Sequence, residues 1–196
     1  MRRALPSVAC LLLAVTACES DRELPTLVEL PDFSLVDQHG EPLGTKALSG
    51  RPYIANFIFT SCPDICPLLT DHLRDVRAQV EAEAAGVQYV SFSVDPQNDT
   101  PEVLLKYSRA RGADHPDWHF LTGRLRAVKQ TVKDGFKQAM DPMPDEPTNI
   151  MHGSHFVLVD GHGSVRGYYR TEPQGLATLV EDAIALARAS GGTASR

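Results

Sequence analysis

Apolar residues in this chain fall into short runs separated by amphipathic stretches. The runs 53–59 and 87–94 are apolar on both faces, a pattern typical of buried central strands. Residues 33–36 alternate apolar with polar positions and precede the turn-forming residues 37–40, which predicts a strand that enters a turn. We therefore expect 53–59 and 87–94 to lie side by side at the centre of a sheet.

Helical spacing of apolar residues follows each of these runs. Residues 68–84 place their apolar positions on one helical face. Residues 99–102 combine a capping residue, an early proline and an acid, which predicts the start of a second helix that ends at Gly112. Residues 125–136 are weakly helical, and 174–189 form a final amphipathic helix.

A hairpin is predicted near the end of the chain, because 154–159 and 165–169 flank the turn sequence at 160–163. The order of elements is strand, strand, helix, strand, helix, hairpin, helix. This order predicts an α/β protein with a thioredoxin-like fold, in which helices flank a central mixed sheet. The sheet would carry an N-terminal strand extension, with an insertion before the C-terminal hairpin.

Composition is that of an ordinary globular domain. The chain has 196 residues, 42% hydrophobic and 22% charged, which suits one domain plus a short targeting segment. Its formal net charge is -6, without a long basic run. This charge argues against a nucleic-acid partner.

The first residues resemble a bacterial lipoprotein signal. Arg2 and Arg3 precede the apolar, uncharged stretch 4–17, which is too short to span a bilayer and ends at Cys18. We expect Cys18 to become the lipidated N-terminus; the alternative is an uncleaved anchor. Both interpretations place the domain outside the cytoplasm at a membrane surface, on the periplasmic side if the source is Gram-negative.

The expected organisation follows from this leader. Residues 1–17 form the signal peptide and 18–31 a polar, proline-punctuated tether. The folded domain spans 32–189, and 190–196 form a flexible tail.

The cysteines carry the chemistry. Of four cysteines, only Cys62 and Cys66 remain in the domain once the signal peptide is removed and Cys18 is lipidated. Prolines at 63 and 67 place the start of the regular helix near Cys66 or Pro67. Both sulfurs would then lie near a helix N-terminus, which lowers the pKa of a thiol and favours thiolate.

Two thiolates predict a metal site as well as redox chemistry. Soft thiolates select Cu(I), zinc or iron–sulfur clusters, and zinc prefers four protein ligands whereas copper accepts two sulfurs and one imidazole. His152 lies in the loop before the strand 154–159, a loop that faces the cysteine loop in thioredoxin-like folds. Strand alternation assigns His155 to the face of Val157 and Val159. We expect His152 to be the third ligand.

The sequence resembles the Sco/SenC family of copper chaperones over residues 32–189. The matching blocks are 57–67, 93–96 with 99–102, 118–123, and His152 eight residues before Asp160. The resemblance implies a thioredoxin-like fold and copper bound by Cys62, Cys66 and His152. It also implies that copper is delivered to the dinuclear copper centre of cytochrome c oxidase, or that the cysteines of that centre are reduced.

The resemblance further implies partners and neighbours of the site. The copper-bearing subunit of cytochrome c oxidase and other copper carriers are the expected partners, and Asp95 is expected near the site. One departure is Met151, because the family commonly has an acidic residue just before the histidine. With Met140 and Met143 it forms a methionine cluster that could assist copper entry or simply pack.

Three other functions use the same cysteines. A metal-independent thiol–disulfide oxidoreductase would need both thiols but not His152. A peroxiredoxin-like peroxidase is suggested by Phe59 and Thr60 before Cys62, although the second cysteine would crowd a peroxide pocket. A structural disulfide in a non-enzymatic binding module is the third. In the copper-binding interpretation, a Cys62–Cys66 disulfide would abolish copper binding because it removes both thiolates.

Overall fold

The computed structural model describes residues 23–63, 65–142, 150–152 and 154–193, with only the backbone given at 141–142, 150–152 and 192–193. Its helical segments are α1 (Thr45–Leu48), α2 (Ile65–Glu83), α3 (Pro101–Ala110), α4 (Leu125–Lys129), the π-helical η1 (Gln130–Gly135) and α5 (Pro173–Thr193). Its strands are β1 (Val28–Glu29), β2 (Ser34–Val36), β3 (Pro42–Gly44), β4 (Tyr53–Ile58), β5 (Gln88–Ser93), β6 (Trp118–Leu121), β7 (Met140–Pro142), β8 (Ile150–His152), β9 (Phe156–Val159) and β10 (Ser164–Tyr169).

A six-stranded mixed sheet forms the centre of the molecule, in the order β1-β10-β9-β4-β5-β6. β4, β5 and β6 are parallel, whereas β9 runs antiparallel to β4. Every residue of β4 and β5 is buried, so the predicted central pair is confirmed. Their largely apolar character on both faces follows from this position, because helices cover both faces.

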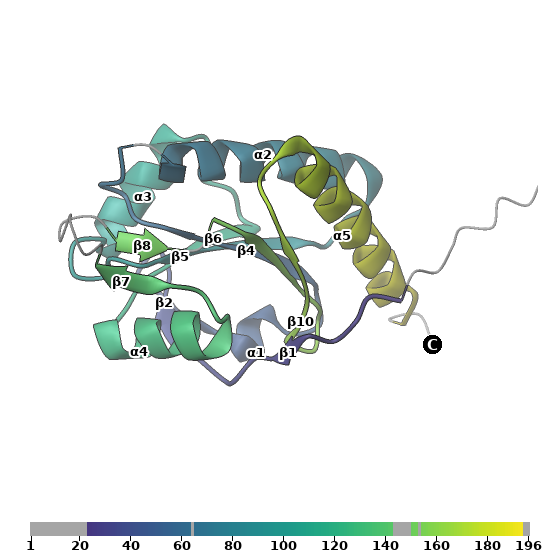
Figure 1. Cartoon of the computed structure of the whole chain (residues 1–196), viewed down its shortest axis with the longest axis horizontal. Helices are drawn as coiled ribbons and strands as arrows, with labels where there is room; N and C mark the ends of the chain where they lie inside the picture. The colour runs from purple at the N-terminus through teal and green to yellow at the C-terminus, as the bar shows by residue number, and fades with distance from the viewer. Residues whose placement is uncertain (1–22, 64, 143–149, 153, 194–196) are drawn as a thin grey trace, which may run out of the picture.

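Helices lie on both sides of this sheet. In Figure 1, α2, α3 and α5 cover one face, and α4 lies on the other with α1. The connections from β4 through α2 to β5 and from β5 through α3 to β6 explain why α2 and α3 share a face, since parallel crossovers have one hand. The predicted thioredoxin-like α/β architecture is therefore confirmed.

Two predicted boundaries are corrected. Part of the expected tether, 18–31, belongs to the fold: β1 pairs with β10, Leu24 is buried, and the Leu30 N–H donates to the Gly163 carbonyl. This part of the expected tether thus covers the outer side of β10 with a short edge strand. The final helix continues through Thr193, so the expected tail of 190–196 is helical over 190–193.

The sequence pattern does not predict the short elements β1, β3, α1 and β6, nor the β7–β8 hairpin, which lies in the expected insertion before β9. None of the described helices is both long and apolar enough to cross a bilayer. The predicted signal peptide and Cys18 lie outside the described residues.

Candidate metal centre

The cysteine pair lies where β4 and β5 end. Because these strands are parallel, their carboxyl ends share one edge of the sheet. The chain leaves β4 at Ile58, carries Cys62 in a loop, and enters α2 at Ile65, so Cys66 lies in the first turn of α2. The expected helix start near Cys66 is therefore confirmed to within one residue.

Hydrogen bonds hold both sulfurs on the same turn of chain. The Cys66 N–H donates to Sγ of Cys62 at 3.4 Å, and the Phe59 N–H donates to Sγ of Cys66 at 3.4 Å. The two cysteines are not joined by a disulfide. Cys66 is fully buried, whereas Cys62 keeps 7% of its surface exposed. Two adjacent soft donors, both largely buried, suit a thiophilic metal such as Cu(I).

The pKa of the Cys66 thiol is raised in the structure, whereas the sequence predicted a lowered one. Loss of solvent raises the pKa of this thiol well above its usual range, and the nearby Cys62 and Asp99 raise it further, against the lowering effect of the Phe59 N–H. The expectation of a lowered pKa at the helix N-terminus is wrong for Cys66, because desolvation outweighs the helix dipole. A bound metal cation would have to displace the thiol proton.

Two hydrogen bonds to the Cys66 carbonyl hold the first turn of α2. The hydroxyl of Thr70 donates to the Cys66 carbonyl at 3.0 Å, and the hydroxyl of Tyr107 donates to the same carbonyl at 3.2 Å. Burial raises the pKa of Tyr107 to about 12, so this phenol remains a donor at neutral pH. These contacts hold the backbone of Cys66 against α3.

Asp99 is the buried carboxylate of the site, and sequence reasoning missed it. Its side chain is 0% exposed and accepts hydrogen bonds from the Thr60 N–H, from the Thr60 hydroxyl at 2.5 Å and from the Ser93 hydroxyl at 2.6 Å. Burial raises the pKa of Asp99, although these donors oppose the shift. Because Thr60 lies two residues before Cys62, Asp99 ties the cysteine loop to the β5–α3 connection.

Asp95, the acid expected near the site, occupies a different position. It follows β5 at the same edge of the sheet but is only partly buried, and its carboxylate accepts a hydrogen bond from the Asn98 amide at 2.8 Å. Its backbone N–H donates to the Ser93 hydroxyl, which in turn bonds Asp99. A role for Asp95 as a neighbour of the metal ligands stays a prediction.

The backbone of His152 lies at the cysteine end of the sheet. β9 is antiparallel to β4, so the residues before Phe156 extend toward the end of β4 from which the cysteine loop departs. His152 lies in β8, opposite Met140 in β7, and so is in a strand rather than in the loop predicted for it. Figure 1 shows β7 and β8 at the same end of the molecule as α3.

The chain enters the hairpin that carries His152 from a residue packed in the core, Phe136. Phe136 is fully buried, with its ring centroid 5.4 Å from that of Phe57 and 4.9 Å from that of Phe92. Lys137 then adopts a left-handed backbone (φ 57°), and the Gln138 N–H donates to the Val132 carbonyl. This turn directs the chain into β7, and the β7–β8 register places the backbone of His152.

His155 precedes β9 and is half-buried. The predicted strand 154–159 begins at Phe156, so the alternation argument does not reach His155. The choice of His152 over His155 as ligand therefore stays a prediction, which rests on the resemblance and on β8.

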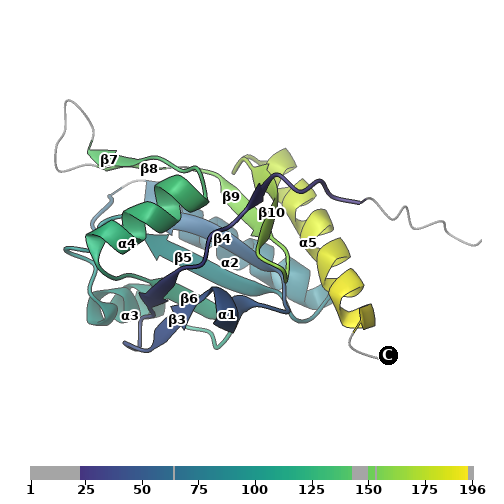
Figure 2. The ribbon, with the colours of Figure 1, turned by 90° about the horizontal axis from the view of Figure 1, so that it is seen from below.

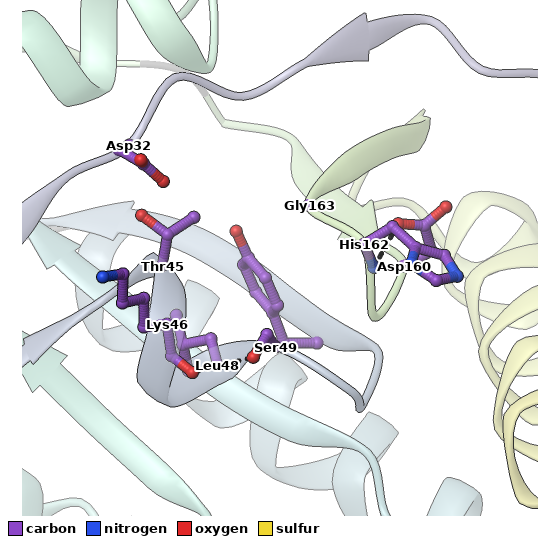
Figure 3. A pocket seen from close by; sticks show the side chains of 9 residues that line it. Asp32, Thr45, Lys46, Leu48, Ser49, Asp160, His162 and Gly163 are labelled. Carbon is purple, nitrogen blue, oxygen red and sulfur yellow. Dashed lines mark hydrogen bonds between the residues drawn. The ribbon is translucent and has the colours of Figure 1, made fainter.

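Two other histidines lie at other parts of the sheet. His162 borders a hollow between α1 and the turn of the β9–β10 hairpin (Figure 3), at the end of the sheet where β4 begins. His119 lies in β6, and burial lowers its pKa. Among the described side chains, three or more His, Cys, Asp or Glu residues nowhere come together as a metal-binding group.

Comparison with known proteins identifies the family. The SCO1/SenC family model matches residues 22–186, which include both cysteines, Asp99 and His152. The chain belongs to the SCO1/SenC family. It is 34% identical over 142 residues to the SCO1 protein homolog of Bacillus subtilis, with 72% of this chain and 73% of that protein covered.

Solved Sco structures share the fold. BsSco, described as having a disulfide switch and as a member of the Sco family of cytochrome c oxidase assembly proteins, superposes with a TM-score of 0.73 at 31% identity, covering 84% of this chain and 96% of its own. Yeast Sco1 with copper bound gives a TM-score of 0.66 at 27% identity, with 79% and 88% covered.

Proposed function

We propose that this Sco protein binds copper through Cys62, Cys66 and His152 and delivers it to the copper centre of cytochrome c oxidase. The observation that carries the proposal is the cysteine pair itself, two thiols on one turn at the edge of the sheet toward which β8 brings His152. Copper is cargo here, so the site must bind it and release it again.

The donor set supports copper over zinc. Two thiolates and one imidazole satisfy Cu(I), whereas structural zinc is almost always held by four protein ligands. The copper-bound yeast relative is consistent with this choice. Cys62, the more exposed of the two sulfurs, is the natural point at which a partner's ligand first reaches the metal.

A second candidate function is reduction of the partner's cysteines, favoured by the unequal burial of the two thiols. Deprotonated Cys62 would attack a partner disulfide and release one partner thiolate, and Cys66 would then attack the mixed disulfide. The second partner thiolate leaves as the Cys62–Cys66 disulfide forms, so two electrons pass to the partner. Burial of Cys66 keeps the resolving thiol protonated until that second step.

We also propose that the protein works outside the cytoplasm, held at a membrane by lipid on Cys18. The support is the uncharged run 4–17 between the arginines and Cys18. Delivery to a membrane-bound oxidase requires a carrier at the same surface.

Copper transfer tests the proposal and separates it from the second candidate. The reduced full chain, loaded with copper, is mixed with the copper-depleted soluble domain of the oxidase subunit. The experiment is run twice, once with the cysteines of that domain reduced and once with them oxidised. We expect copper to pass to the reduced domain, measured as the copper bound to each protein after the two are separated. Uptake no faster than from a copper–chelator complex would contradict delivery. Copper-free reduction of the oxidised domain, without delivery, would establish the reductase instead.

A further inference from the structure

The exposed face of α4 and η1 is strongly basic in an otherwise acidic chain. Residues 124–137 contain five basic side chains and one acidic one, whereas the whole chain has a formal net charge of -6. The exposed basic residues are Arg124, Arg126, Lys129, Lys133 and Lys137. Arg126, Lys129 and Lys133 are three and four residues apart along α4 and η1, a spacing that places them on one side of the helical segment, and Lys137 follows its end. We call this surface the basic face.

Most arginines outside the basic face are ion-paired, whereas the basic face gathers unpaired ones. Six of the eight arginines described elsewhere pair with carboxylates, namely Arg74, Arg77, Arg109, Arg111, Arg166 and Arg188. Within the described part of the chain, Arg124, Arg126 and Lys129 form no ion pair within 4.0 Å. A surface with a large excess of one charge sign is suited to steering a partner of the opposite sign.

An apolar side chain lies within the basic face. Leu125 is 37% exposed and lines a shallow hollow together with Arg126, Lys129, Gln130, Lys133 and Asp134. An exposed apolar group with charged residues around it, most of them cations, matches the anatomy of a protein interface, which has an apolar centre and a polar rim.

The helical segment that carries the basic face leads directly into the hairpin that carries His152. η1 leads through Phe136 into β7, whose Met140 pairs with His152. In Figures 1 and 2, α4 lies at the end of the molecule that carries β7 and β8, whereas the described chain begins at the opposite end, beside α5. A lipid on Cys18 would hold that opposite end near the bilayer, which favours a protein over a lipid surface as the occupant of the basic face.

We propose that the basic face docks an acidic patch on the protein that exchanges copper with this chain. The proposal rests on the proposed function and names the recognition chemistry of the partner. Docking at this face would hold the partner beside the hairpin of His152 while the metal changes ligands. Charged rims act mainly on the rate of association, so the effect depends on salt.

Charge reversal tests this docking separately from copper transfer. Association of the reduced, copper-free full chain with the soluble copper domain of the source organism's own oxidase is measured by surface plasmon resonance. The variant is Arg126→Glu/Lys129→Glu. The matched control, Lys106→Glu/Arg170→Glu, makes the same change of net charge at exposed residues outside the basic face. Copper loading of each variant is measured alone.

We expect the Arg126→Glu/Lys129→Glu variant to associate at least about tenfold more weakly at about 0.02 M salt and to match the wild type at about 0.5 M salt. The control should associate like the wild type, and all three proteins should load copper equally. Equal association of both variants, or no association of the wild type, overturns the proposal. Binding of the basic face to phosphatidylglycerol vesicles but not to the domain also overturns it. Charge-dependent association without copper transfer leaves the docking site established and refutes delivery.

Discussion

Replacement of Cys66 by serine is expected to abolish copper loading of the reduced protein. A serine hydroxyl is a hard donor that stays protonated at neutral pH, so the metal loses one of two soft ligands. We expect the affinity for Cu(I) to fall by at least about a thousandfold, which corresponds to about 4 kcal/mol. The measurement is a competition titration against a Cu(I) chelator under reducing conditions.

Serine also preserves the shape of the turn, which keeps this test specific. The Phe59 N–H can donate to a serine oxygen in place of Sγ of Cys66, so the fold should survive. Cys62→Ser should lose copper to a similar extent, whereas Ser61→Ala, an exposed neighbour, should bind like the wild type. Near-wild-type affinity in either cysteine variant would show that the pair is not the metal site.

Asp99→Ala is expected to lower the free energy of unfolding by about 2–4 kcal/mol, because the Thr60 N–H and the Thr60 and Ser93 hydroxyls lose a shared buried acceptor. Release of Thr60 should also loosen the loop of Cys62, so copper affinity should fall with stability. Urea unfolding of the reduced protein, followed by fluorescence of Trp118, measures the first effect.

Two further variants serve as controls. Asp99→Asn separates the loss of a hydrogen-bond acceptor from the loss of a charge, and Asp95→Ala removes a carboxylate at a neighbouring site. Asp99→Asn should stay within about 1 kcal/mol of the wild type, because its amide oxygen still offers Thr60 an acceptor, and because burial, which raises the pKa of Asp99, reduces what a charge contributes at this position. Asp95→Ala removes a partly exposed carboxylate and should cost less than about 1 kcal/mol. If Asp95→Ala is the more damaging substitution, the anchor of the loop has been assigned to the wrong acid.

The central architecture could be predicted from sequence because its signals are local. The apolar runs that became β4 and β5 exclude solvent on both faces, and prolines at 63 and 67 restrict where α2 can begin. Thr100 caps α3 with its side chain, as the sequence around it predicts. Each of these features depends on neighbours within a few residues.

The missed features depend on contacts between distant residues. Asp99 has the local pattern of a residue before a helix, yet its side chain turns inward to Thr60, 39 residues away in sequence. β1 has two residues, and its pairing with β10 leaves no periodic pattern to detect. The pKa of Cys66 likewise depends on packing around α2 that the local sequence does not report.

X-ray absorption of the Cu(I)-loaded protein tests the central claim, that Cys62, Cys66 and His152 are the copper ligands, most directly. We expect the wild-type spectrum to contain two sulfur donors and the outer-shell scattering of one imidazole. His152→Ala should lose the imidazole scattering and keep both sulfurs, while His155→Ala should match the wild type. A spectrum from which His155→Ala removes the imidazole and His152→Ala does not would contradict the assignment.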